Sequence, residues 1–137
     1  MSGRSFFDTN VLVYTDDQDS PQKKERAVEL YEASHRARQA VVSTQVLQEY
    51  FVTVTRKLGV AAETARRKAE LFGRMHLVRP DLQDLLAAVD LHRLHGFSFW
   101  DALIVRAALV SACRRLYTEH LQHGRRIDGL EVVNPFA

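Results

Sequence analysis

The chain has 137 residues, of which 46% are hydrophobic and 26% charged, and its formal net charge is +2. These values are typical of one globular domain spanning residues 1–137, and no apolar run is long enough to cross a bilayer. The single cysteine, Cys113, excludes an internal disulfide and a cysteine-based zinc site, and without a visible signal peptide we expect a cytoplasmic location.

The first informative stretch runs from Phe6 to Tyr14, where an apolar pair, one carboxylate and a second apolar run follow one another. We interpret its start as a short buried strand that carries Asp8 at its C-terminal end, the edge at which open α/β sheets bind ligands. A buried carboxylate there needs a cationic partner. The alternative interpretation is that Asp8 caps the next turn.

A helix is predicted from Pro21 to about Arg38, followed by a strand over Ala40–Ser43. A second helix then begins, with Thr44 as its expected cap, and ends at Gly59. Its apolar residues recur at helical spacing, and Glu49 lies at the rim of this apolar stripe. Glu49 is therefore either a cleft residue or an ordinary surface glutamate.

The next helix, Ala61 to about Phe72, belongs to a basic segment between Thr53 and Pro80, where seven Lys or Arg residues accompany two acids. Such a segment is either a solvated helix face or a surface that attracts a phosphate backbone. If it attracts phosphate, the centre of the surface is the run Arg66-Arg67-Lys68.

A short strand is predicted over His76–Pro80, a helix from Asp81 to Gly96, and a second helix over Ser98–Cys113. The second of these is apolar on nearly every face and should be buried. Its only acid, Asp101, lies in the first turn, where it is either a capping group, a ligand, or both, because a carboxylate has two oxygens.

The strand Arg115–Thr118 ends at the polar pair Glu119-His120, and Leu130–Phe136 is predicted as a final edge strand. Alternating strands and helices predict a mostly parallel sheet with helices on both faces. The absence of a glycine-rich phosphate loop argues against a Walker-type or Rossmann nucleotide site.

Asp8, Glu49 and Asp101 are the candidate site residues. If they converge, their like charges raise one another's pKa unless a cation joins them. Hard oxygen ligands suit Mg²⁺ or Mn²⁺, and such an ion supports hydrolysis of a phosphodiester with water as the nucleophile.

Several short motifs, in this order and spacing, resemble the PIN-domain family, and among its branches the VapC-type toxins of prokaryotic toxin–antitoxin pairs. The resemblance covers essentially the whole chain. The motifs are Phe7-Asp8-Thr9-Asn10-Val11-Leu12, the internal Glu49, Phe99-Trp100-Asp101-Ala102-Leu103-Ile104, Leu116-Tyr117-Thr118-Glu119 and Val132-Val133-Asn134-Pro135-Phe136.

This resemblance implies a three-layer α/β/α sandwich and a Mg²⁺- or Mn²⁺-dependent endoribonuclease. Asp8, Glu49 and Asp101 match three of the family's acidic residues, and Asn10 and Thr118 match polar, substrate-side positions near the site. It further implies a homodimer and a cognate antitoxin whose C-terminal segment covers the cleft.

One departure concerns the fourth acidic position, where the family usually has Glu-Asp and this chain has Glu119-His120. Neutral imidazole is a poor Mg²⁺ ligand, and a protonated one repels cations. Three outcomes are open: Glu119 substitutes, His120 favours Mn²⁺, or catalysis is weakened. The alternatives to a toxin nuclease are therefore a catalytically impaired module that binds RNA or an antitoxin, and a housekeeping RNA-processing nuclease.

Overall fold

The structure is a computed structural model that describes residues 3–137. Its central sheet has the strand order β3-β2-β1-β4-β6-β5. The strands are β1 (Arg4–Phe7), β2 (Ala40–Ser43), β3 (His76–Val78), β4 (Cys113–Tyr117), β5 (Arg126–Ile127) and β6 (Leu130–Val133). The helices are α1 (Thr9–Tyr14), α2 (Pro21–Arg36), α3 (Thr44–Lys57), α4 (Ala62–Phe72), α5 (Leu82–His95) and α6 (Phe99–Val110).

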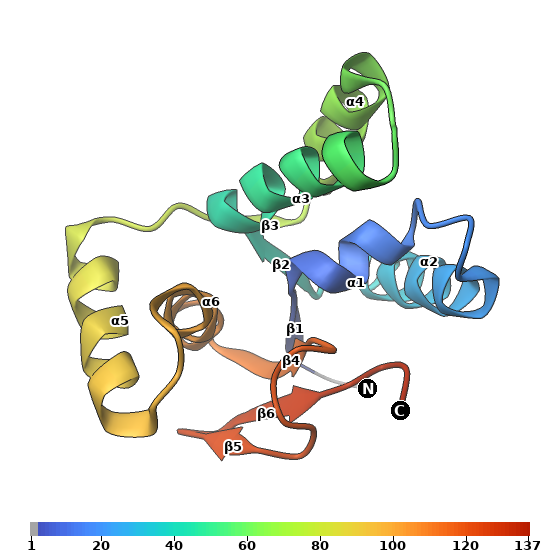
Figure 1. Cartoon of the computed structure of the whole chain (residues 1–137). Helices are drawn as coiled ribbons and strands as arrows, with labels where there is room; N and C mark the ends of the chain where they lie inside the picture. Colours follow the sequence, from blue (N-terminus) through green and yellow to red (C-terminus); the bar gives the residue numbers. More distant parts are fainter. Residues whose placement is uncertain (1–2) are drawn as a thin grey trace.

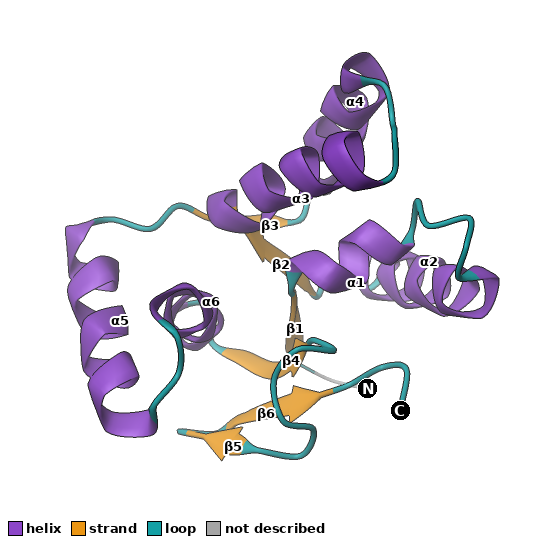
Figure 2. Cartoon of the chain, viewed as in Figure 1, coloured by secondary structure: helices purple, strands orange, loops and turns teal. Residues whose placement is uncertain are grey.

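Helices enclose the sheet on both sides. Figure 1 shows α1 and α2 on one face and α5 and α6 on the other, while α3 and α4 pack against each other beyond β2 and β3. All strand pairs are parallel except β5 with β6, so the colouring in Figure 2 displays a mostly parallel layer of strands between two layers of helices. The predicted three-layer α/β/α architecture is confirmed.

The core lies where β1 and β2 meet the helices. Phe6 and Phe7 of β1 and Val41 and Val42 of β2 are completely buried, as expected for central strands covered on both faces. Burying each such side chain contributes about 1.5–3 kcal/mol to folding. This core fixes the C-terminal ends of β1 and β4 side by side, since Phe7 is in register with Tyr117.

The structure adds one element that the sequence did not indicate and corrects three details of the sequence-based predictions. After β1 the apolar run forms the short helix α1, and Ser43 rather than Thr44 caps α3, since its Oγ accepts from the Val46 N–H at 3.3 Å. β6 is not the edge strand, because β5 pairs outside it. The helix α6 is not buried on every face, since Trp100 is 63% exposed.

The predicted start and end of α5 agree with the structure, and capping interactions explain both. Asp81 and Asp84 form a reciprocal capping box, and Gly96 ends the helix with φ 74°, a left-handed conformation that favours glycine. Among the described residues, no helix is both long and apolar enough to cross a membrane.

Candidate active site

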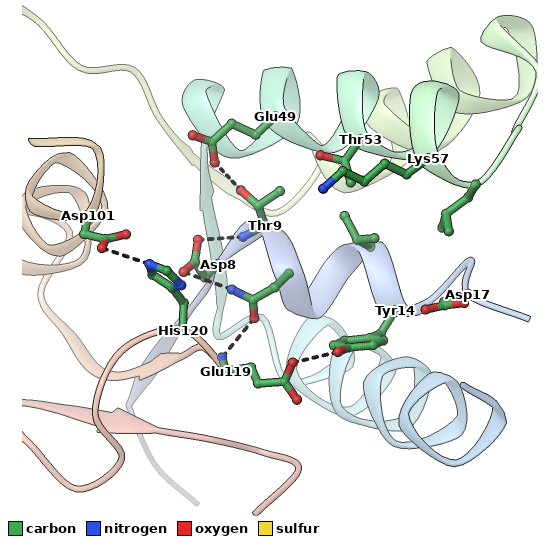
Figure 3. Close-up of a pocket in the computed structure, with 13 residues that line it drawn as sticks. Asp8, Thr9, Tyr14, Asp17, Glu49, Thr53, Lys57, Asp101, Glu119 and His120 are labelled. Carbon is green, nitrogen blue, oxygen red and sulfur yellow. Dashed lines mark hydrogen bonds and ion pairs between the residues drawn. The ribbon is translucent and has the colours of Figure 1, made fainter. Parts of the chain in front are cut away.

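A cavity of about 530 Å³ opens at the C-terminal ends of β1 and β4 (Figure 3). Its walls come from α1, α3, the start of α6 and the segment after β4, so four regions distant in sequence meet there. It is lined by Asp8, Thr9, Asn10, Val13, Tyr14, Asp17, Glu49, Thr53, Lys57, Leu58, Asp101, Glu119 and His120. The three carboxylates singled out from the sequence thus line one cavity.

Asp8 lies at the floor of this cavity, directly after β1, and is only 5% exposed. It is also the N-cap of α1, where its Oδ1 accepts from the Thr9 N–H at 2.7 Å. Oδ2 accepts from Thr118 Oγ1 at 2.8 Å and from Asn10 Nδ2 at 3.3 Å. The capping interpretation of Asp8 is confirmed, and the same residue lines the cavity; its role as a ligand residue stays a prediction.

Among residues 3–137, no Lys or Arg forms an ion pair with the Asp8 carboxylate. Burial raises its pKa from 3.8 to about 6, against the lowering effect of the hydrogen bonds from Thr118 and Thr9. The negative charges of Glu49 and Asp101 make smaller contributions to this raised pKa. A bound cation would reverse both unfavourable effects.

Glu49 reaches the cavity from the side of α3 and is half-buried, as its rim position predicted. Its Oε1 accepts from Thr9 Oγ1 at 2.5 Å, and its Oε2 accepts from Gln45 Nε2 at 3.0 Å. The first bond links Glu49 to the residue after Asp8 and so fixes α3 relative to α1.

Asp101 is supplied by the first turn of α6, opposite Glu49 (Figure 3). Its backbone N–H donates to Ser98 Oγ at 3.1 Å, so the capping bond uses the main chain and leaves the carboxylate for the cavity. There Oδ2 lies 3.2 Å from His120 Nε2.

Asn10 and Thr118 connect the end of β4 to the start of α1. Asn10 Oδ1 accepts from the Glu119 N–H at 2.9 Å, and Thr118 Oγ1 accepts from the His120 N–H at 3.0 Å while donating to Asp8. Thr118 is completely buried. The contacts of Thr118 orient Asp8 and the segment after β4.

Glu119 forms its side-chain contacts with Tyr14 and Lys23 and not with the other carboxylates of the described cavity. Tyr14 OH donates to its Oε1 at 2.6 Å, and Lys23 Nζ forms an ion pair with its Oε2. Burial raises the pKa of Glu119, but the hydrogen bonds from Lys23 and Tyr14 outweigh burial and hold that pKa below its usual range. Glu119 as it stands joins α1 and α2 to the end of β4.

Asp8, Glu49 and Asp101 supply carboxylate oxygens, the type of ligand that a hard divalent cation prefers. Asp8 is also buried, and no Lys or Arg of the described residues forms an ion pair with it. As the side chains stand, no three Asp, Glu, His or Cys groups of residues 3–137 are grouped closely enough to share an ion. In this arrangement His120 contacts Asp101, and both carboxylate oxygens of Glu49 accept hydrogen bonds from neighbouring side chains.

Several cavity residues escaped the sequence analysis, among them Thr9, Tyr14, Thr53 and Lys57. A signal for two of them existed. Thr53 and Lys57 follow Glu49 at intervals of four, so all three lie on one face of α3. Tyr14 had no such signal, because the sequence did not indicate the short helix α1.

The fold and the site together define the class of protein: an α/β domain with a carboxylate-lined cavity at the C-terminal ends of its parallel strands. The family model described as PIN domain matches residues 5–120. The chain belongs to the PIN-domain family, as its motifs predicted, and its sheet and helices form the PIN fold. Among curated proteins, no sequence gives a significant match.

Solved structures with the same fold include toxins of toxin–antitoxin systems. A toxin–antitoxin complex from Klebsiella pneumoniae is similar with a TM-score of 0.70 at 22% identity, covering 96% of this chain and 97% of that one. VapC20 of Mycobacterium tuberculosis, a sarcin–ricin loop cleaving toxin, gives 0.69 at 18% identity over 82% and 87%. VapBC2 of Rickettsia felis, bound to a promoter DNA fragment, gives 0.62 at 18% over 93% and 96%.

Proposed function

We propose that this chain is a Mg²⁺- or Mn²⁺-dependent endoribonuclease and the toxin of a toxin–antitoxin pair. The observation that carries the proposal is the presence of Asp8, Glu49 and Asp101 in one cavity at the sheet edge of a PIN domain. The fold shared with VapC20 and with two toxin–antitoxin assemblies supports the toxin assignment.

In this proposal Asp8, Glu49 and Asp101 would hold the ion, which would make water a better nucleophile and would offset charge on the reacting phosphate. The hydrogen bonds from the Thr9 N–H and from Thr118 fix the orientation of the Asp8 carboxylate at the cavity. Asp8 or a neighbouring carboxylate would take the proton that the attacking water loses. As the new P–O bond forms, the P–O bond to the RNA leaving oxygen would break, and that oxygen would take a proton from solvent.

The partners we propose are single-stranded RNA as substrate, a cognate antitoxin as inhibitor and a second copy of the chain in a homodimer. The antitoxin is supported by the fold shared with toxin–antitoxin complexes. Light scattering after gel filtration tests the homodimer, and an antitoxin encoded beside the toxin tests the pair.

Cleavage of RNA with and without divalent ions tests the activity. We expect cleavage with Mg²⁺ or Mn²⁺, none with chelator, and a loss of at least about 100-fold in Asp8→Asn, because several kcal/mol of stabilisation disappear with the ion. Asp90→Asn is the matched control, since Asp90 is exposed on α5 and does not line the cavity. Unchanged cleavage in Asp8→Asn removes Asp8 from the mechanism.

A second candidate function, a catalytically impaired module that binds RNA or an antitoxin, is favoured by one contact. His120 contacts Asp101, so an imidazole rather than a carboxylate occupies the fourth acidic position. The variant His120→Asp separates the two functions. If cleavage appears only in that variant, the impaired module is the better description; cleavage by the unmodified chain supports the nuclease.

A further inference from the structure

The cavity presents an electrostatic problem for a nucleic-acid substrate. Of its lining residues, five are acids, and among the described residues that line it only one is a lysine or arginine. That residue is Lys57, at the end of α3. A polyanion approaching this cavity would meet repulsion everywhere except near Lys57 and near any bound cation.

Lys57 is also available to bind a substrate, because within residues 3–137 its amine forms no hydrogen bond or ion pair. Thr53, one turn earlier on the same face of α3, likewise has a hydroxyl without a hydrogen-bond partner in the described chain. Figure 3 shows both side chains on the cavity side of α3, beyond Glu49.

The basic run on α4 is arranged differently. Lys68 Nζ lies 2.8 Å from Asp16 Oδ1, and Arg67 lies 3.4 Å from Glu63 on the surface. Arg66 lines a separate apolar groove between α3 and α4. None of the three lines the cavity, so this run, for which phosphate binding was one of two alternatives, is less well placed than Lys57.

We propose that Lys57 and Thr53 form a phosphate subsite that binds the backbone of single-stranded RNA beside the reacting phosphodiester, with the ammonium as the charge and the hydroxyl as the hydrogen-bond donor. The subsite lies on the same helix face as Glu49, so it sets the path of the RNA along α3 into the cavity. The inference rests on the proposed function and assigns residues to substrate binding that the carboxylate motif does not contain.

The experiment compares substitutions at two neighbouring positions, Lys57 and Arg56. Lys57→Gln and Arg56→Gln remove the same charge from adjacent exposed residues of α3, but only Lys57 lines the cavity. Affinity for a single-stranded RNA is measured by fluorescence anisotropy in chelator, over a series of salt concentrations, with Lys57→Arg as the conservative variant. Binding in chelator does not depend on cleavage.

We expect Lys57→Gln to weaken binding about fivefold and to lower the slope of log affinity against log salt by about 0.7, the value for one phosphate on a single strand. Arg56→Gln should change neither quantity appreciably, and Lys57→Arg should retain both. In cleavage assays Lys57→Gln should raise KM and leave kcat unchanged, the pattern of lost uniform binding.

Equal effects of Lys57→Gln and Arg56→Gln would overturn the subsite, because charge alone would then explain the loss. A fall in kcat at unchanged KM would also overturn it. If the unmodified chain binds the RNA but does not cut it, the nuclease proposal fails while the subsite is still tested by the binding series. A chain that binds no RNA at all removes both.

Discussion

The Nε2 atom of His120 lies 3.2 Å from Oδ2 of Asp101. The imidazole is 66% exposed and the carboxylate 19%, so an exposed side chain contacts one oxygen of a proposed metal ligand. A cation that binds Asp101 through this oxygen must displace His120 first. His120, which stands at the fourth acidic position, would therefore compete with a cation for the Oδ2 atom of Asp101.

His120→Ala should therefore strengthen Mn²⁺ binding. The gain should be about fivefold at most, because an exposed pair contributes no more than about 1 kcal/mol. Isothermal titration calorimetry on the two proteins measures it, with His123→Ala as the control outside the cavity. Weaker Mn²⁺ binding in His120→Ala would mean that the imidazole is itself a ligand.

Asp8 should make stability depend on pH in the absence of divalent ions. Burial raises its folded-state pKa from 3.8 to about 6, so the folded chain binds this proton more tightly than the unfolded chain. The resulting stabilisation is complete below about pH 4 and is lost as the pH rises through about 6. Since one pKa unit is about 1.4 kcal/mol, the loss is at most roughly 3 kcal/mol.

Asp8→Asn removes this dependence and should be more stable than the parent chain at pH 8, with the difference narrowing toward pH 4. Urea unfolding of both proteins in chelator at the two pH values measures the difference. A stability difference that is the same at pH 4 and pH 8 would contradict the raised pKa of Asp8.

Glu119→Gln distinguishes a structural role from metal binding. Because Lys23 and Tyr14 both bind Glu119, we expect a lower melting temperature at neutral pH, and divalent-dependent cleavage within a few-fold of the parent. The lowered pKa of Glu119 implies stabilisation above the unfolded pKa, near 4.5, that is lost as the pH falls through the folded value. Abolished metal dependence would instead identify Glu119 as a ligand that leaves Lys23 when an ion binds.

Thr118→Val should be harmful although Thr118 is buried beneath the cavity. The change removes the donor to Asp8 and the acceptor for the His120 N–H, and leaving buried polar groups unpaired costs about 1–3 kcal/mol. We expect lower stability and weaker cleavage, with Thr118→Ser close to the parent in both. Equal unfolding midpoints for Val and Ser would show that these bonds contribute little.

The parts of the fold that sequence predicted best are those governed by local chemistry. β2 was predicted at its observed bounds, and the ends of α5 follow from Asp81 and Gly96. β5 was missed because two residues carry no periodicity, and it exists only through pairing with β6. The exposure of Trp100 was missed for a related reason, since composition does not reveal which helix face lacks a covering neighbour.

The candidate site, like the fold, was predicted only in part. Asp8, Glu49 and Asp101 were identified from their positions at a strand end, a stripe rim and a first turn, and the structure places them in one cavity. The ion pairs of Glu119 and His120 could not be predicted, because they depend on distances between segments remote in sequence. The assignment of the three carboxylates as ligands stays a prediction.

Anomalous diffraction from crystals soaked in Mn²⁺ tests the shared-ion proposal most directly. We expect an anomalous peak inside the cavity, within coordination distance of Asp8 and of Asp101 or Glu49, with His120 turned away from Asp101. The peak should be absent in Asp8→Asn. An empty cavity at Mn²⁺ concentrations that support RNA cleavage, or an ion bound elsewhere with full cleavage by Asp8→Asn, would contradict it.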